Sequence, residues 1–253
     1  MTSFDFNTDL YASSSLTEGI DWARRFRRHE RFDDSPDRTD EEARTVILAP
    51  HGGGIERGTS ELCLAVAGHH PANLPQVPPA GVTYDYWMFE GVREGDNREL
   101  HVTSTGCDDE VAVSLCAGSL NALSLHGFSD DDQVVLVGGA TPDSTRNPLR
   151  ESLLDGLRDA HFVVRDPGEH GELNGNDPCN IVNRTMLGMG AQLELSTPLR
   201  DAMFTEISRP RRKHTTTQLF WTFVAVCRDA IERLEAEQTA QRPNVFRCPP
   251  EDG

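Results

Sequence analysis

The chain has 253 residues, of which 41 are acidic and 24 basic, so its formal net charge is −17. A charge of this sign repels the phosphate backbone of nucleic acids and argues against general nucleic-acid binding. Apolar residues make up 37% of the chain, enough for a core, and no apolar run reaches the roughly 20 residues that span a bilayer. We therefore expect a folded protein that binds neither nucleic acid nor membrane.

The N-terminus and the cysteines indicate the expected compartment. Residues 1–10 are polar and lack the basic-then-apolar pattern of a signal peptide. Six cysteines are spread along the chain without a Cys-x-x-Cys pair, which is typical of separate reduced thiols rather than a disulfide framework. We predict a cytoplasmic protein, released on lysis if it is phage-derived.

Strands and helices are expected to alternate from residue 45 onward. Residues 1–44 are expected to form an acidic extension with a helix at 16–28, and residues 241–253 a Pro-rich tail. Between them, residues 45–240 are expected to form one domain. Its expected strands are 45–50, 84–90, 100–104, 122–126, 134–137, 162–164 and 191–196, and its expected helices are 59–68, 108–117, 149–160 and 217–237. This alternation predicts an α/β protein, a three-layer α/β/α sandwich with a mixed, mostly parallel sheet.

A glycine-rich turn follows the first apolar strand, in the sequence Ala49-Pro-His-Gly-Gly-Gly-Ile-Glu56. Ligands collect at the carboxyl ends of strands in open α/β sheets, so His51 and Glu56 lie where a site is expected. The glycines let the backbone turn sharply and pass close to an ion. The alternatives are a phosphate cradle or a plain turn, although the segment lacks the Lys-Ser/Thr of a P-loop and the spacing of a dinucleotide fingerprint.

A third metal ligand is expected at the end of another strand. A catalytic zinc ion commonly has three protein ligands and one open position for water, and two histidines with one glutamate form a standard set. His126 follows Leu123 and Leu125 in an alternating strand, so its side chain is expected to face away from these leucines. We therefore predict one zinc ion on His51, Glu56 and His126. Taken alone, His126 could also be a hydrogen-bonded polar residue of the core.

Glu194 is the predicted general base. In residues 191–196, Leu193 and Leu195 face one side of the strand, whereas Gln192 and Glu194 face the other. A carboxylate inside such an apolar strand is costly unless it is paired or functional. Beside a metal, a carboxylate can accept the proton of an activated water and pass it to the leaving amine. A strand with one solvated face is the alternative.

The remaining histidines have weaker local context. His69 and His70 are expected to form a surface pair at a helix end, and His101 to be an exposed strand residue.

Several segments, in order, resemble the phage-type poly-γ-glutamate hydrolases, a family similar to compact zinc carboxypeptidases. The resembling segments are Ala49-Pro-His-Gly-Gly-Gly-Ile-Glu56 with Gly58-Thr-Ser-Glu61, Leu100-His-Val-Thr-Ser104 leading to Asp108-Asp-Glu110, Ser124-Leu-His-Gly127, Val137-Gly-Gly139, Asn180-Ile-Val-Asn-Arg184 and Gly190-Ala-Gln-Leu-Glu-Leu-Ser196. The resemblance extends from about residue 45 to 210. It implies a carboxypeptidase-like α/β/α fold, zinc on His51, Glu56 and His126, and a catalytic carboxylate at Glu194. It also implies cleavage of γ-glutamyl amide bonds.

Arg184 is the predicted anchor for a substrate carboxylate, supported by hydrogen bonds from Asn180 and Asn183. Arginine suits this role because its planar fork matches a carboxylate. A surface ion pair with an aspartate is the alternative for Arg184. The basic segment Arg209-Pro-Arg-Arg-Lys-His214 either lines the substrate groove or forms a solvated loop.

The sequence thus predicts a metallopeptidase-type enzyme that cleaves poly-γ-glutamate through a zinc-activated water, with Glu194 as proton carrier. Two alternatives stay open. One is a zinc-dependent deacylase or carboxypeptidase that acts on N-acyl amino acids or small peptides. The other is a non-catalytic, phage-associated binding protein. Substrate stereochemistry, endo or exo cleavage and oligomeric state are left open.

Overall fold

The computed structural model describes residues 4–28, 44–73, 82–142 and 146–240. The expected Pro-rich tail and residues 29–43 of the expected N-terminal extension lie outside the described residues, so the expected domain boundaries stay predictions. No helix within the described ranges is long and apolar enough to cross a membrane.

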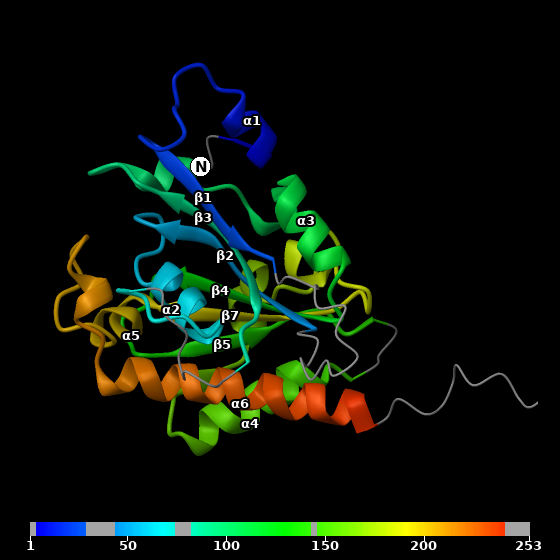
Figure 1. Cartoon of the computed structure of the whole chain (residues 1–253). Coiled ribbons are helices and arrows are strands. Elements are labelled where there is room, and N and C mark those ends of the chain that lie inside the picture. The colour runs from blue at the N-terminus through cyan, green and yellow to red at the C-terminus, as the bar shows by residue number, and fades with distance from the viewer. Residues whose placement is uncertain (1–3, 29–43, 74–81, 143–145, 241–253) are drawn as a thin grey trace, which may run out of the picture.

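In the part of the chain that the structure describes, seven strands form one mixed sheet in the order β1-β3-β2-β4-β7-β5-β6 (Figure 1). The four central strands β3, β2, β4 and β7 are parallel to one another, whereas β1 is antiparallel to β3, and β5 is antiparallel to β7. The strands span Trp22–Arg27 (β1), Thr45–Gly53 (β2), Asp85–Gly91 (β3), Asn121–Phe128 (β4), Val135–Gly138 (β5), Val164–Arg165 (β6) and Ala191–Ser196 (β7). The predicted mixed, mostly parallel sheet is confirmed.

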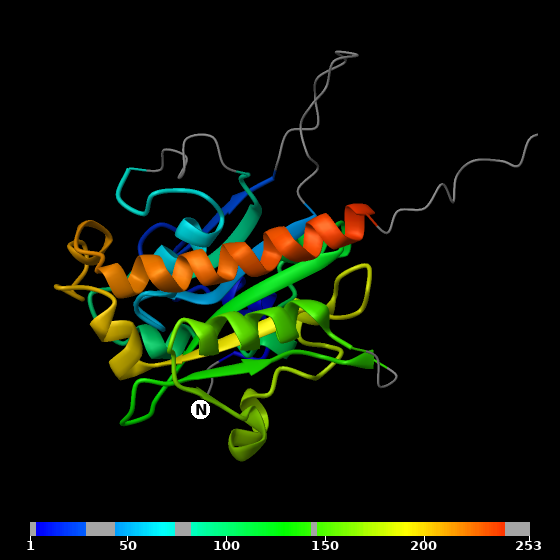
Figure 2. The same ribbon diagram turned by 90° about the horizontal axis from the view of Figure 1, so that it is seen from below.

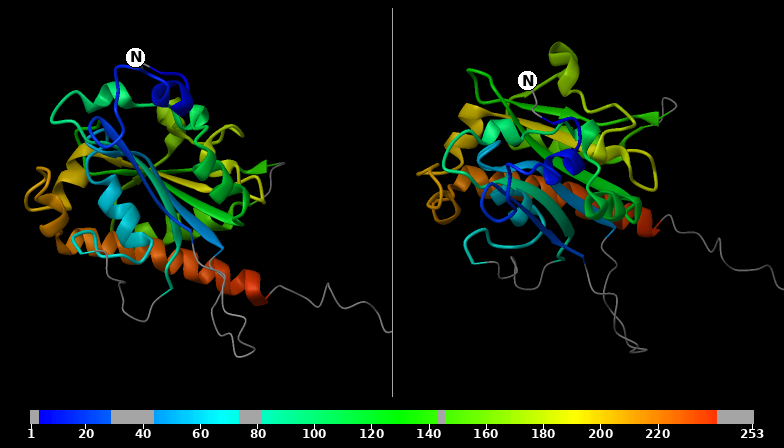
Figure 3. Two further views of the ribbon diagram at one scale, coloured as in Figure 1. Left: turned by 45° about the horizontal axis from the view of Figure 1, so that its top comes forward. Right: turned by 90° about the horizontal axis from the view of Figure 1, so that it is seen from above.

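Helices cover both faces of this sheet, which confirms the three-layer sandwich. α2, α4 and α6 lie on one face, with α4 and α6 side by side (Figure 2), and α1 and α3 lie on the other (Figure 3). The helices span Asn7–Tyr11 (α1), Thr59–Val66 (α2), Glu110–Ala117 (α3), Pro148–Asp159 (α4), Thr197–Ala202 (α5) and Gln218–Ala240 (α6). Short 3-10 helices span Asn97–Leu100 (η1), Ser104–Gly106 (η2), Pro167–Leu173 (η4), Ile181–Asn183 (η5) and Arg212–His214 (η6).

The strands divide their side chains between two apolar clusters, as strand alternation requires. Leu125 and Leu193 pack toward α6, where they join Phe223 in the larger cluster. Leu48 and Phe89 point to the opposite face and join the cluster beneath α1 and α3. The residues that alternate with Leu125 and Leu193 therefore point toward the α1 and α3 side.

The helix expected at residues 16–28 is wrong, because part of this segment forms the edge strand β1. Trp22 stacks on Tyr11 and Phe89, with ring centroids 4.5 and 5.7 Å apart. Pairing with β3 also satisfies backbone groups that a helix would have satisfied internally. Residues 4–28 are thus packed on the same sheet as the rest of the chain.

The strand expected at residues 100–104 is also wrong. Leu100 ends η1 and Ser104 begins η2, with an extended connection between them. Leu100 and Val102 are buried in the core. Their spacing of two residues, with a polar residue between them, is the alternation that a strand would also show. The segment packs over the carboxyl ends of the central strands instead of joining the sheet.

Candidate metal centre

Three parallel strands bring their carboxyl ends to one edge of the sheet. β4 lies between β2 and β7, and His126 is the register partner of Glu194. Neighbouring residues in register point to the same face, here the face opposite Leu125 and Leu193. The orientation expected for His126 and Glu194 is therefore confirmed.

A β-bulge turns His51 toward the same face. The β2–β3 register runs from Ala49 opposite Met88 to Gly52 opposite Glu90, so β2 has one extra residue in this interval. Strict alternation from Ala49 would place His51 on the α6 side, and the extra residue reverses its direction. Gly53 then closes the turn with a φ of 67°.

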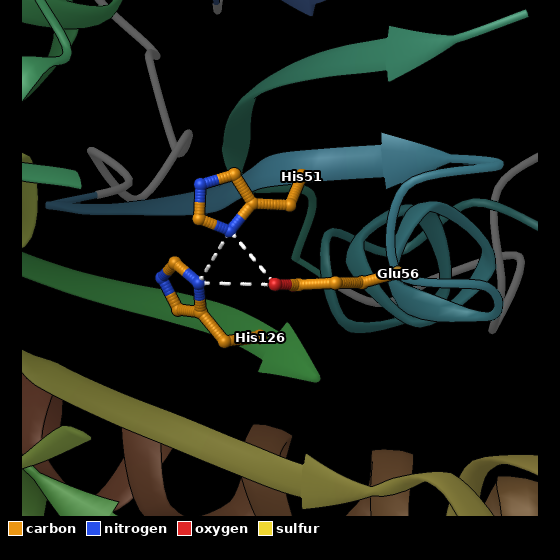
Figure 4. Close-up of side chains that lie close together, drawn as sticks. All are labelled: His51, Glu56 and His126. Atoms are coloured by element: carbon orange, nitrogen blue, oxygen red, sulfur yellow. Dashed lines mark hydrogen bonds and ion pairs between the residues drawn. The ribbon is translucent and has the colours of Figure 1, made fainter. Parts of the chain in front are cut away.

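Side chains of His51, Glu56 and His126 converge on one point (Figure 4). His51 Nδ1 lies 3.0 Å from Glu56 Oε1 and 3.1 Å from His126 Nδ1. His126 Nδ1 lies 3.8 Å from Glu56 Oε2. Both imidazoles are buried, with 3% and 2% of the residue exposed, and Glu56 is partly buried. The grouping of these three residues that the sequence predicted is confirmed, while their role as metal ligands stays a prediction.

The outer nitrogens of both imidazoles have partners of their own. His51 Nε2 lies 2.6 Å from the Val102 carbonyl, which can only accept, so Nε2 carries a proton. His126 Nε2 lies 2.8 Å from the Ser124 hydroxyl. With its proton on Nε2, neutral His51 presents the lone pair of Nδ1 to the shared point. The Ser124 hydroxyl can donate or accept, and His126 presents the same lone pair in the tautomer that carries its proton on Nε2.

Glu56 is oriented by the backbone. The Gly127 N–H donates to Glu56 Oε2 at 2.8 Å. Oε1, the oxygen closest to His51, thus faces the centre. Burial lowers the pKa of His51, but the Glu56 carboxylate more than offsets this and raises it above its usual value. Burial and the neighbouring His51 hold the pKa of His126 well below its usual value.

The donor set fits a divalent ion such as zinc. Two imidazole lone pairs and a carboxylate oxygen repel one another at 3.0 to 3.8 Å unless a proton or a cation lies among them. Zinc bonds of about 2.0–2.2 Å in tetrahedral geometry place ligand atoms about 3.3–3.5 Å apart. The observed distances lie on both sides of this range, at 3.0, 3.1 and 3.8 Å. The carbonyl and hydroxyl behind the imidazoles are the outer partners that metal-bound histidines require.

Glu194 lies next to this group, and 4% of it is exposed. Its Oε1 accepts a hydrogen bond of 2.9 Å from Gln192, which in turn accepts one of 2.8 Å from Asn180. Burial raises the pKa of Glu194 well above its usual value, and the charge of Glu56 adds to this effect. A carboxyl with a raised pKa is suited to taking up and releasing a proton.

A cavity of about 1060 Å³ opens onto the centre and includes His51, Glu56, His126 and Glu194 in its lining. Three arginines also line it, at positions 57, 98 and 200. None of these arginines was predicted. Their guanidinium groups place positive charge at the cavity of a strongly acidic chain, and only proximity in the fold reveals them.

The sequence also missed the position of His101. The expectation of an exposed strand residue is wrong, because its ring stacks on His51 with centroids 3.8 Å apart. His101 Nε2 lies 3.8 Å from Glu56 Oε1. The charge of His51, together with burial, lowers the pKa of His101 to about 3. His69 is likewise buried, contrary to the expected surface pair.

The structure does not bring Arg184 to the cavity lining. Its guanidinium donates to the carbonyls of Cys179 and Cys107, at 3.1 and 3.3 Å. Asn183 binds backbone groups, including the Gly175 carbonyl at 2.8 Å. Asn180 does line the cavity, where it supports Gln192. The anchor predicted at Arg184 thus has no support in this geometry.

The basic segment 209–214 does not line the cavity either. Arg212 is buried, and its Nε lies 2.8 Å from Glu61 Oε2. Arg209 donates to the Gly91 and Val92 carbonyls at the end of β3. Both arginines stabilise the loop around the β2 and β3 ends.

The family model for poly-gamma-glutamate hydrolase matches residues 27–226. The chain belongs to this family. Among its relatives, the SPbeta prophage-derived protein YoqZ of Bacillus subtilis (strain 168) is 36% identical over 188 residues. YndL of the same organism is 32% identical over 181 residues. These matches cover 74% and 72% of this chain, but 62% and 64% of the relatives' own lengths.

Two solved structures are similar over nearly the whole chain. A bacteriophage poly-gamma-glutamate hydrolase matches with a TM-score of 0.74 and 27% identity, covering 95% of this chain and 99% of that one. The zinc-free apo form of YndL matches with a TM-score of 0.70 and 26% identity, covering 92% and 99%. The resemblance inferred from the sequence is thus confirmed.

Proposed function

We propose that this protein hydrolyses the γ-glutamyl amide bonds of poly-γ-glutamate, with one zinc ion held by His51, Glu56 and His126. The observation that carries the proposal is the convergence of two Nδ1 atoms and a carboxylate oxygen, 3.0 to 3.8 Å apart, beside a buried carboxyl in an open cavity. Family membership supports the choice of substrate, and the similarity to YndL, whose apo form is zinc-free, supports the choice of metal.

Each side chain has a separate task in this proposal. Zinc, when bound, supplies Lewis acidity that makes a water more acidic and polarises a carbonyl. Glu194 accepts the proton of the attacking water and returns it to the leaving nitrogen. Gln192 holds Glu194 Oε1 in place, which leaves the other carboxyl oxygen available for proton transfer. The backbone of Gly127 keeps Glu56 turned toward the two histidines.

The charge of the cavity agrees with a polyanionic substrate. A chain of charge −17 repels poly-γ-glutamate at long range. Arg57, Arg98 and Arg200 offset this repulsion where the polymer must approach the centre.

Chromatographic sizing of poly-γ-glutamate after incubation tests the activity. We expect the polymer to shorten with the protein, to keep its length when a chelator is present, and to shorten again when zinc is restored. Intact polymer with zinc-loaded protein would contradict the substrate assignment, and hydrolysis of N-acyl-glutamate in its place would indicate a deacylase.

Glu194→Gln tests the proton carrier. The variant should keep its zinc and lose activity by about 10²–10⁴-fold, the range typical of general acid–base catalysis. Glu206→Gln is the matched control, because Glu206 is exposed and does not line the cavity. Full activity in Glu194→Gln would remove Glu194 from the mechanism.

A further inference from the structure

Arg200 is a buried arginine whose hydrogen bonds within the protein use three of its five N–H groups. Only 6% of the residue is exposed, yet it lines the cavity. Nε donates to the Leu195 carbonyl at 3.1 Å, Nη1 to the Arg57 carbonyl at 2.8 Å, and Nη2 to the Thr197 hydroxyl at 3.1 Å. A guanidinium has five N–H groups, so one on each Nη remains.

No carboxylate lies within ion-pair distance of Arg200 among residues 4–28, 44–73, 82–142 and 146–240. Two other arginines are buried in the described part of the chain, and both have a carboxylate partner. Arg212 lies 2.8 Å from Glu61, and Arg228 lies 3.5 Å from Glu232. Burial lowers the pKa of Arg200, and the charges of Glu56 and Asp201 offset this effect only in part. A buried charge without a direct ion-pair partner is costly, so this guanidinium is suited to binding an anionic ligand.

The guanidinium of Arg200 lies against the backbone of the metal centre. A Cβ placed on Gly127 would lie 2.5 Å from Arg200 Cζ, so the guanidinium occupies the space that a side chain there would need. Gly127 follows His126 and donates its N–H to Glu56. The unpaired cation is thus fixed one residue from a proposed ligand.

We propose that Arg200 binds the substrate α-carboxylate next to the scissile bond and thereby selects γ-linked glutamate. The proposal rests on the proposed function. In a γ-linked chain the carbon that bears the amide nitrogen also bears a free carboxylate. In the interior of an α-linked chain that position is occupied by the next peptide carbonyl. A fixed guanidinium fork beside the centre therefore distinguishes the two linkages by charge and shape.

The test uses a γ-linked glutamate oligomer in which one residue carries an α-carboxamide in place of the α-carboxylate. The net charge of the oligomer changes little, so the comparison reports a local contact. Mass spectrometry of the products compares cleavage at the altered residue with cleavage of the same bond in the unmodified oligomer. We expect about 100-fold slower cleavage there, because a neutral carboxamide keeps the shape of the carboxylate but loses the charge-assisted hydrogen bonds to the guanidinium.

Arg200→Gln should bring the ratio of the two cleavage rates close to one, whatever its overall activity. Arg200→Lys, which keeps the charge and loses the fork, should give an intermediate ratio. Arg228→Gln is the matched control, because Arg228 is 7% exposed, donates to the Val66 and Val82 carbonyls and does not line the cavity. Its ratio should equal that of the wild type.

Equal cleavage of both bonds by the wild type would overturn this inference and leave the proposed function standing. A ratio that persists in a folded Arg200 variant would also overturn it. If the wild type leaves the unmodified oligomer intact, the proposed function fails. Calorimetric titration with both oligomers then tests Arg200 separately, since equal affinities would remove it as the carboxylate-binding residue.

Discussion

Strands β4 and β7 bury very different side chains on their two faces. On the face toward α6, Leu125, Leu193 and Phe223 form a purely apolar cluster. On the opposite face, at the carboxyl ends of the same strands, His126 and Glu194 are almost equally buried. Apolar burial stabilises the fold without requiring any particular partner, whereas each buried polar group needs one. Stability and chemistry are thus separated between residues that alternate along β4 and β7.

Removing a proposed metal ligand should have the largest effect on activity. This variant should differ most clearly from variants in the apolar cluster beneath α6. We expect His51→Ala and His126→Ala to lose stoichiometric zinc and activity by about 10³-fold or more, since a three-residue site that loses one ligand no longer holds the ion in an open geometry. Metal analysis and polymer sizing measure this. His161→Asn should retain zinc, because His161 is exposed at a φ of 63° that asparagine tolerates. Unchanged zinc content in His51→Ala would contradict the assignment.

Removing a large side chain from the apolar cluster beneath α6 should lower stability and leave zinc binding unchanged. Phe223 is fully buried, and its ring packs edge-on against Phe162 at 5.6 Å. We expect Phe223→Ala to lower the free energy of unfolding by about 3–5 kcal/mol. Zinc affinity of the folded protein should stay the same. Denaturant unfolding measures the loss, and Phe26→Ala, at a side chain that is 49% exposed, should change stability little. A loss of zinc affinity in folded Phe223→Ala would show that packing beneath α6 also controls the metal centre on the opposite face of the sheet.

Glu194 should make the metal-free protein less stable as pH rises. Its pKa is raised in the fold above the unfolded value of about 4.3, so its stabilising contribution is complete below that value and is lost as pH rises toward the folded pKa. Glu194→Gln cannot ionise. Its stability relative to the wild type should therefore increase by up to about 1.4 kcal/mol per pH unit in that window. Urea unfolding in chelator from pH 5 to 8 checks this, and a pH-independent difference would refute it.

The smallest effect is expected at the cavity rim. Arg98 is exposed, lines the cavity and has no ion-pair partner in the described part of the chain. Arg98→Gln should raise KM for the polymer several-fold at low salt, because it removes long-range attraction, and kcat should change little. Near 1 M salt, where the screening length falls to about 3 Å, the difference should vanish. A salt-independent change would indicate a direct contact with substrate.

Much of the site could be predicted because local patterns set the direction of side chains. Alternation with leucines placed His126 and Glu194 on one face, and parallel strands placed their ends at one edge. The edge strand β1 could not be predicted in this way. Its pattern in isolation fitted a helix, and only pairing with β3 and the stack on Tyr11 favour the strand.

The sequence by itself determined which residues could form the centre, since imidazole and carboxylate side chains at the ends of apolar strands restrict the choice to a few positions. Tertiary structure decided how they meet. The β-bulge before Gly52 reverses His51, which alternation alone directs to the wrong face. Tertiary structure also decided that Arg200, not Arg184, lines the cavity, because access to a cavity depends on which backbone groups bind each guanidinium. Those contacts join residues more than 70 positions apart, a separation at which local sequence pattern carries no information.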